Sequence, residues 1–213
     1  MRLISSLFGI RAGRWAKLFA GLAFIGIGVA FTKRANLGLG PWDVLGDGLA
    51  QITGIQLGTA SIVIGAIVMV LWIPIREKPG VGTLTNLVLI GIFMNAALIV
   101  IQSAAGFLLQ SAWLIFGLLL IGVGSVSYLA SQLGAGPRDG LMLGLSRKTG
   151  WSVRLTRTAL EITVLVAGWL LGGAVGVGTV VIALTIGPVI QLVAAMTGEE
   201  LIEQTVPPAR KFD

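Results

Sequence analysis

The sequence predicts an all-α polytopic membrane protein, with six transmembrane helices arranged as two inverted three-helix repeats and a short extra helix in each repeat. Two observations predict this class, and the first is composition. Of the 213 residues, 55% are hydrophobic and 11% are charged, whereas soluble globular domains carry about 25% charged residues. Residues 79–137 and 162–198 contain no charged side chain. Apolar stretches longer than about 18 residues are typical of membrane spans.

The second observation is an internal repeat. The segment LGLGPWD at 37–43 returns as LGAGPRD at 133–139, an offset of 96 positions, and ten of the eighteen positions from 37 to 54 are identical at that offset. The register continues without a gap, because VGT at 81–83 returns at 177–179. The chain therefore contains two copies of one unit, and we call two residues separated by this offset counterparts.

This duplication divides the chain into five segments. We expect a cytoplasmic basic leader at 1–14, a first membrane repeat at 15–96, a linker at 97–110, a second membrane repeat at 111–192 and a cytoplasmic tail at 193–213. A basic leader before an apolar run resembles a secretory signal peptide. The apolar run belongs to the repeat, however, and no small-residue cleavage site follows it, so we expect a retained first span.

Six apolar runs predict the spans. Each run is long enough to cross the hydrocarbon core, which takes about 20 residues of helix. In chain order the predicted spans are 15–32, 55–75, 81–101, 111–130, 152–173 and 176–196. The six tryptophans fall near the ends of these spans, as expected of an aromatic belt at the membrane surface.

Basic residues in the loops predict the orientation. The leader, the loop between the second and third spans, the region between the fourth and fifth spans, and the tail are basic, while the other side holds only Lys33 and Arg34. Because positive residues favour the cytoplasmic side, both termini should be cytoplasmic. Each unit holds three spans, and an odd number forces the second unit to cross in the opposite direction. Such inverted repeats are found in many secondary transporters.

The repeated motif predicts two short helices, at 41–53 and 137–149. Proline is favoured at the first helical position, and a glycine, Gly54 or Gly150, follows each predicted end as a suitable C-terminal cap. The motif aspartate would be the third helical residue, where its carboxylate meets free N–H groups. A helix-start signal by itself explains these residues, and that interpretation stays open beside a functional one.

The functional interpretation depends on depth in the membrane. If the short helices dip between the spans, they are half-helices of the kind that build substrate sites. Helix N-termini attract anions, but here an aspartate already occupies that end, so a cation, a proton or a polar neutral solute fits better. The candidate substrate-binding residues of the chain are Asp43, Asp139, Glu161, Asn95, Gln191 and Arg138.

Three of these candidates are polar residues inside predicted spans. Asn95 and Gln191 are counterparts, and amides at such positions commonly bond between packed helices, which is the alternative to a site. Glu161 lies near mid-membrane on the fifth predicted span, where an acid is expected to face the bundle interior or a cavity. Its alternative is an intrahelical pair with Arg157 near the cytoplasmic rim.

The sequence contains no cysteine and no histidine. Without them there is no disulfide or thiolate metal site, and the commonest acid–base and metal-binding side chain is missing. We therefore expect no enzyme activity, no cofactor and no metal. The formal net charge of +6 could suggest nucleic-acid binding, but the basic residues lie beside spans as topology signals, so we expect no nucleic-acid partner.

Three segments together resemble the YczE/YitT-type family of bacterial membrane proteins, and the YczE branch is the most similar. They are RANLGLGPWD at 34–43, LGAGPRDGLM at 133–142 and GVGTV at 176–180. The resemblance covers about 15–195. It implies a multi-pass protein of the bacterial plasma (inner) membrane with about six spans, and it brings no established activity, cofactor or catalytic residue.

The predicted function is transport of a small solute or ion by alternating access between the two inverted halves. The alternative is an accessory protein without transport, a scaffold or regulator that acts on a partner protein, with the basic segment 147–157 docking protein or anionic lipid. A membrane enzyme is a third interpretation, which the lack of a catalytic constellation disfavours. The expected partners are the lipid bilayer and a small solute or ion, and a second copy of the chain or a cytoplasmic protein stays open.

Overall fold

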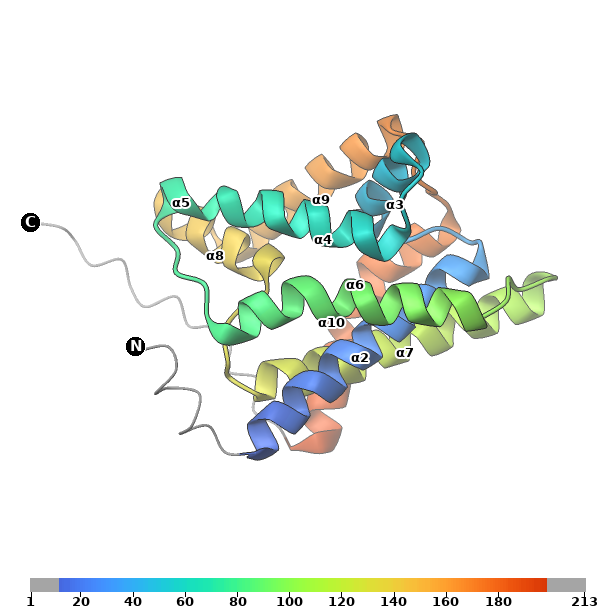
Figure 1. Ribbon diagram of the computed structural model, residues 1–213, viewed down its shortest axis with the longest axis horizontal. Helices are drawn as coiled ribbons and strands as arrows, with labels where there is room; N and C mark the ends of the chain where they lie inside the picture. Colours follow the sequence, from blue (N-terminus) through green and yellow to red (C-terminus); the bar gives the residue numbers. More distant parts are fainter. Residues whose placement is uncertain (1–11, 199–213) are drawn as a thin grey trace, which may run out of the picture.

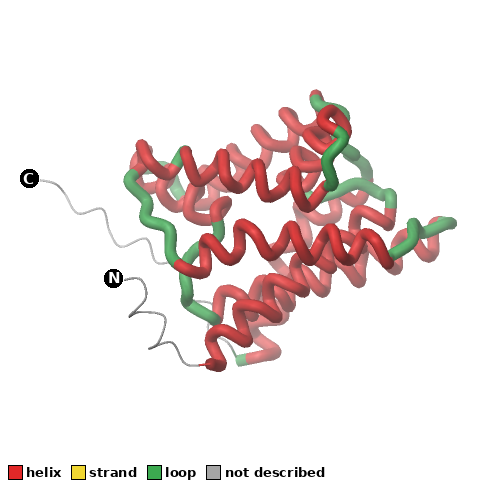
Figure 2. Tube along the Cα trace, viewed as in Figure 1, coloured by secondary structure: helices red, strands yellow, loops and turns green. Residues whose placement is uncertain are grey.

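The computed structural model describes residues 12–198, and these residues form only helices and loops (Figure 2). The helices are α2 (Ala12–Ala35), α3 (Pro41–Thr53), α4 (Leu57–Val70), α5 (Trp72–Ile75), α6 (Val81–Val100), α7 (Phe107–Ala130), α8 (Pro137–Thr149), α9 (Val153–Leu170) and α10 (Val177–Thr197). The predicted all-α class is confirmed. Most of the predicted leader and tail, residues 1–11 and 199–213, lies outside the described residues.

Five helical segments are long and apolar enough to cross a membrane. They are α2, the continuous segment α4–α5 (Leu57–Ile75), α6, α7 and α10. The expected sixth span coincides with α9, which is 18 residues long but is not among the five. It carries Arg154, Arg157 and Glu161, and these charged side chains lower its hydropathy. Among the described residues, five helical segments therefore have the length and hydropathy of a membrane span, whereas the sequence predicted six.

The helices form two groups that lie side by side (Figure 1). In the first group, α2 packs along both α7 and α6, and α10 packs on α7. In the second group, α3 packs between α4 and α9, and α8 contacts α4, α5 and α9. The packing of α4 along α6 joins the two groups.

Glycines allow the close crossing of α2 and α7. A Cβ built on Gly21 would lie 2.7 Å from the carbonyl oxygen of Gly124, and a Cβ built on Gly28 would lie 2.7 Å from the carbonyl oxygen of Gly117. Real Cβ atoms do not come this close to an oxygen, so larger residues would force the helices apart. Small residues at such crossings are typical of helix packing in membranes.

The short helices α3 and α8 begin and end on the same residue types. Each starts with a proline, Pro41 or Pro137, whose missing N–H is not needed in the first turn. Each ends before a glycine, Gly54 or Gly150, in the left-handed conformation with φ of 74°. Glycine adopts this conformation without the strain that a Cβ would cause, so both helices stop after 13 residues.

The loop before each short helix is held by a long helix from the other copy of the unit. The N–H of Gly82, at the start of α6, donates to the carbonyl of Leu133 at 2.8 Å. The N–H of Gly178, at the start of α10, donates to the carbonyl of Leu37 at 2.7 Å. These bonds fix both loops, and hence the positions at which α3 and α8 begin.

The exterior of the bundle is apolar. Large hydrophobic side chains stand out from the long helices, including Leu108 (85% exposed), Ile99 (79%) and Leu184 (72%). In water such a surface would be unfavourable, whereas in lipid the same side chains are well solvated. The described part of the chain therefore has the surface expected of a protein embedded in a bilayer.

Candidate functional site

The short helices α3 and α8 approach each other with their N-terminal ends. Three residues separate the end of α3 from the start of α4. The chain that continues from α4 through α5 reaches the C-terminal half of α8, where a Cβ on Gly144 would lie 2.9 Å from the Glu77 side chain. The C-terminal ends of α3 and α8 thus lie near opposite ends of α4–α5, as Figure 1 shows. We call these the α3 end and the α8 end of the molecule.

Arg138 connects the two N-terminal ends. Its Nη2 lies 3.4 Å from Oδ1 of Asp43 on α3 and 3.2 Å from Oγ of Ser61 on α4. The guanidinium carbon also lies 5.2 Å from the ring centroid of Trp42, within the range of a cation–π contact. The Asp43 side chain is 14% exposed and that of Arg138 is 36% exposed. Two of the predicted site residues are therefore brought together, with Ser61 and Trp42 added to them.

Burial affects the Asp43 carboxyl strongly. Removal from water raises its pKa above the ordinary value, because the charged form loses its hydration. The charge of Arg138 and its hydrogen bond oppose this shift. Burial disfavours the charged carboxylate and Arg138 favours it, so the Asp43 and Arg138 side chains form an interdependent unit.

Asp139 has a different environment from its counterpart Asp43. No hydrogen bond or ion pair reaches its carboxylate from another described residue. Burial raises the pKa of Asp139, and the charges of Arg138 and Arg157 lower it in part. The amide of Asn86 is close to this carboxylate, because a Cβ built on Gly136 would lie 3.3 Å from both Asn86 Nδ2 and Asp139 Oδ2.

Glu161 forms the intrahelical pair that the sequence offered as an alternative. Its Oε1 lies 2.9 Å from Nε of Arg157, one turn earlier on α9, and its side chain is 29% exposed. Glu161 therefore already has a partner, and it is Arg157 that links it electrostatically to Asp139.

The two predicted amides are placed differently. Asn95 bonds α6 to α4: its Oδ1 accepts from the N–H of Gly58 at 2.8 Å and its Nδ2 donates to Oγ1 of Thr59 at 3.1 Å. Gln191 is exposed on α10. The structure thus gives Asn95 the helix-bridging role of the alternative interpretation, and it does not bring the two amides together.

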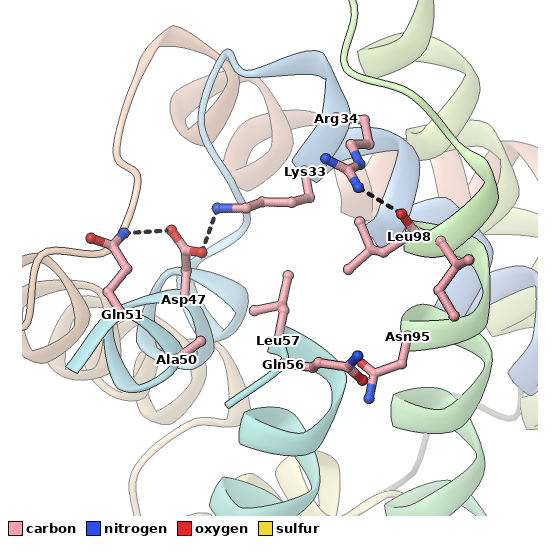
Figure 3. Close-up of a pocket in the computed structure, with 10 residues that line it drawn as sticks. Lys33, Arg34, Asp47, Ala50, Gln51, Gln56, Leu57, Asn95 and Leu98 are labelled. Atoms are coloured by element: carbon pink, nitrogen blue, oxygen red, sulfur yellow. Dashed lines mark hydrogen bonds and ion pairs between the residues drawn. The ribbon is translucent and has the colours of Figure 1, made fainter. Parts of the chain in front are cut away.

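A pocket of about 390 Å³ opens at the α3 end (Figure 3). Its polar wall includes Lys33, Arg34, Asp47, Gln51 and Asn95, and its apolar floor includes Leu57 and Leu98. Asp47 is one helical turn beyond Asp43 on α3, and Leu57 is one turn before Ser61 on α4. One helical turn is about 5.4 Å, so the floor of the pocket is close to the Arg138–Asp43 pair.

Asp47 is the residue that sequence reasoning missed. It is 3% exposed and forms an ion pair with Lys33, while its Oδ2 accepts from Gln51 Nε2 at 3.1 Å and from the N–H of Ala174 at 3.0 Å. Its counterpart is Leu143, so the repeat offered no signal. An acid four residues after the motif aspartate, on the same helix face, was the available signal.

Among residues 12–198 no three carboxylate, histidine or cysteine side chains are grouped so that they could hold a metal ion. The polar groups at the centre are instead two guanidinium groups, three carboxylates, an amide and a hydroxyl. Such groups bind by hydrogen bonds and ion pairs. The arrangement suits recognition of a small polar or charged molecule.

The all-helical fold and the apolar exterior define a multi-pass integral membrane protein. The chain belongs to a family of unknown function (DUF6198), which residues 12–195 match. The predicted resemblance to the YczE-type proteins is thereby confirmed.

Three relatives show how far the similarity extends. An uncharacterized protein of Haemophilus influenzae is 40% identical over 82% of this chain and 79% of its own length. The uncharacterized membrane protein YczE of Bacillus subtilis is 37% identical over 84% of both chains. The uncharacterized protein YyaS of Bacillus subtilis is 28% identical over 75% of this chain and 81% of its own length. No solved structure matches the chain.

Proposed function

We propose that this protein is a secondary transporter of a small solute or ion, which works by alternating access between two inverted halves. The observation that carries the proposal is the Arg138–Asp43 pair, held between the N-terminal ends of two short helices that come from different halves. Broken or short helices that meet between spans build the substrate sites of many transporters. Charged residues at such a position are costly and are retained for function.

Reciprocal contacts support an inverted duplication. Exchanging each residue for its counterpart turns the bond from Gly82 to Leu133 into the bond from Gly178 to Leu37, and both bonds are present. A two-fold axis relating the halves produces this reciprocity, since a contact from the first half to the second must recur from the second to the first.

The crossing of α2 and α7 shows the same reciprocity between counterpart residues. Gly21 and Gly117 are counterparts, as are Gly28 and Gly124, and the close contacts are Gly21 with Gly124 and Gly28 with Gly117. Helix α2 thus packs against its own counterpart, which supports a two-fold axis at this crossing. Antiparallel packing of counterpart helices is what opposite membrane orientations of the halves require.

One difference between the halves supports alternating access. At the α3 end, α4 packs along α6, and Asn95 bonds to Gly58. The counterpart helices α9 and α10 make no comparable contact at the α8 end, and Gly187, counterpart of the closely packed Gly91, has open space beside it. Two similar halves in different arrangements are expected of a transporter that has one side closed and the other open.

Contacts of α8 with α5 and with Glu77 separate the Arg138–Asp43 pair from the α8 end of the molecule in this proposal. Nε1 of Trp72 donates to the carbonyl of Pro137 at 3.0 Å, and Arg147 forms an ion pair with Glu77. The pocket at the α3 end is lined by Leu57 but by neither Asp43 nor Arg138. Thin barriers on both sides of a central charged pair are consistent with a site that is exposed to each side in turn.

Uptake into proteoliposomes tests the proposal. The purified full-length protein is reconstituted, and uptake of labelled amines, inorganic cations and polar neutral solutes is measured with and without a proton gradient. We expect at least one solute to accumulate, and Arg138→Gln to abolish its uptake while Lys148→Gln, an exposed matched control, leaves it unchanged. Absence of flux for every solute would overturn the transport proposal.

The accessory role is the alternative, and one observation favours it. Arg147, Lys148 and Arg154 lie close together in sequence at the α8 end, and all three are exposed. A basic segment of this kind attracts anionic lipids or an acidic protein surface. Capture of a partner that is lost on neutralising these three residues, together with no flux, would favour this role.

A further inference from the structure

We propose that the Asp139 carboxylate and the Asn86 amide bind a small organic monocation, an ammonium or guanidinium group, in the way that Asp43 binds the Arg138 guanidinium. This inference rests on the proposed function and names the substrate class of the same central site. It is carried by the contacts of Arg138, by the groups around Asp139 that lack partners, and by the positions that differ between the two halves.

The first step is the pairing of charges at the centre. Asp43 is paired with Arg138, and Glu161 is paired with Arg157. Asp139 is the remaining carboxylate, and no described residue forms an ion pair with it. Three carboxylates face two guanidinium groups, so Asp139 has no direct cationic partner, and a bound monovalent cation would stabilise its charged form.

As a second step, the contacts of the Arg138 guanidinium show which groups bind an organic cation at the centre. Its guanidinium is a tethered organic cation, and it is held by a carboxylate, a hydroxyl and an aromatic ring, from Asp43, Ser61 and Trp42. These three kinds of group are the ordinary components of organic-cation recognition. The Asp43 side of the centre is thus a filled site for such a cation.

The third step is the difference between the two sides. The counterpart of Arg138 is Trp42, so α3 extends no cationic side chain toward Asp139. The counterpart of Asn86 is Ile182. Asn86 lies near Asp139, and Ile182 lies near Asp43 in the same way, since a Cβ on Gly40 would lie 3.4 Å from both Ile182 Cγ2 and Asp43 Oδ2. The Asp139 side therefore has a polar amide where the filled side has an apolar group.

The Asn86 amide is the independent observation that points to a ligand. No side-chain hydrogen bond to it is formed within the described residues, although it lies half-buried on α6, beside Gly136 of the second motif. Half-buried amides normally find partners, because an unmade hydrogen bond is costly. The amide oxygen and the carboxylate together offer acceptors that a cationic donor group binds most strongly, because its bond to a carboxylate is charge-assisted.

Other ligand classes fit less well. Mg²⁺ and Ca²⁺ require about six oxygen ligands, and among the described residues no three acidic side chains are grouped so that they could hold a metal ion. An anion would face the charge of Asp139 directly. An ammonium or guanidinium ion needs only a few acceptors, and the Asp139 carboxylate and the Asn86 amide oxygen supply them.

Equilibrium binding of radiolabelled methylammonium and methylguanidinium to the purified full-length protein in detergent tests the inference. We expect both probes to bind, with Asp139→Asn weakening the affinity by about tenfold or more, because a charge-assisted hydrogen bond is lost. Asp139→Glu should retain binding. Asn86→Ile should weaken it less, and Lys148→Gln, which removes an exposed charge on α8, is the control that should not change it.

A second variant gives a distinct result. Trp42→Arg places a tethered guanidinium on α3 at the position equivalent to Arg138, and it should fill the Asp139 site and exclude both probes while the protein remains monodisperse. No binding to the wild-type protein, or unchanged binding to Asp139→Asn, would overturn the inference. Binding without flux would leave the site intact and overturn only transport, so the two failures are distinguishable.

Discussion

Trp42 and Arg138 are counterparts in the two copies of the motif, and they are in contact, with the guanidinium carbon of Arg138 5.2 Å from the ring centroid of Trp42. In the inverted arrangement proposed above, equivalent positions touch only near the axis that relates the two repeats. The contact brings one difference between the two motifs to the Arg138–Asp43 pair, where a tryptophan and an arginine cannot have the same role.

The Arg138–Asp43 pair should contribute to stability as a unit. Arg138→Gln leaves the Asp43 carboxylate without its charged partner, and we expect a loss of about 1–3 kcal/mol in the free energy of unfolding. The double variant Asp43→Asn/Arg138→Gln should recover much of that loss, because no buried charge is left unpaired. Thermal unfolding in detergent of the wild type, both single variants and the double variant measures the coupling. Additive effects of the two changes would contradict it.

Asp139 should make the protein less stable as the pH rises. Its pKa is raised in the folded protein above the ordinary 3.8. Below pH 3.8 the carboxyl is protonated in both states, so its full contribution is present. As the pH rises, the unfolded form loses the proton first, and stability falls until the pH passes the raised folded pKa. Melting temperatures of Asp139→Asn should fall less than those of the wild type over this range.

The opposite result would contradict the cause assigned to this shift. If Asp139→Asn steepened the fall in melting temperature with rising pH, Arg138 and Arg157 would dominate over burial, and the folded pKa would lie below its ordinary value. Asp43→Asn is a useful comparison, because burial also raises the pKa of Asp43.

Gly21 should tolerate no larger residue. A Cβ at this position would lie 2.7 Å from the carbonyl oxygen of Gly124, so Gly21→Ala should force α2 away from α7 and cost about 1–3 kcal/mol through overpacking. Gly13→Ala, in the same helix, is the matched control, because nothing lies within 4 Å of its Cβ. Thermal unfolding of both variants decides this. Equal stability of the two would mean that the crossing is not tightly packed.

Cysteine pairs should report the two arrangements of the halves, since the natural chain has no cysteine. Thr59 and Asn95 are bonded at 3.1 Å, so cysteines at these positions should cross-link in the resting protein. Their counterparts, Leu155 and Gln191, should cross-link only when substrate drives the α8 end closed. Gel shifts of both pairs with and without substrate give the measurement. A Leu155–Gln191 cysteine pair that never cross-links would contradict alternating access.

Glu161→Gln should abolish transport while the protein still inserts into the membrane. The change frees Arg157 from its 2.9 Å pair, and the released guanidinium would turn to Asp139 and occupy the cation site. Uptake assays combined with membrane fractionation measure both properties. Unchanged uptake would remove Glu161 and Arg157 from the proposed mechanism.

Some of this molecule followed from local sequence. Low charge and long apolar runs predicted the helical membrane class, and the motif segments predicted the family. These properties depend on hydropathy and on short-range patterns, which act along a single helix. The count of spans is the exception, because Arg154, Arg157 and Glu161 in α9 leave five helices with the composition of a span.

The convergence of side chains was decided only by the tertiary structure. Arg138 and Asp43 lie 95 positions apart, and no spacing rule links them. Lys33 pairs with Asp47, Asn95 bridges to α4, and Gln191 stays apart on α10. The physical reason is that side-chain contacts depend on how helices cross, and the crossings depend on close backbone approach at glycines from distant parts of the chain. Sequence by itself determined which residues were polar within the membrane region, and packing determined which of them meet.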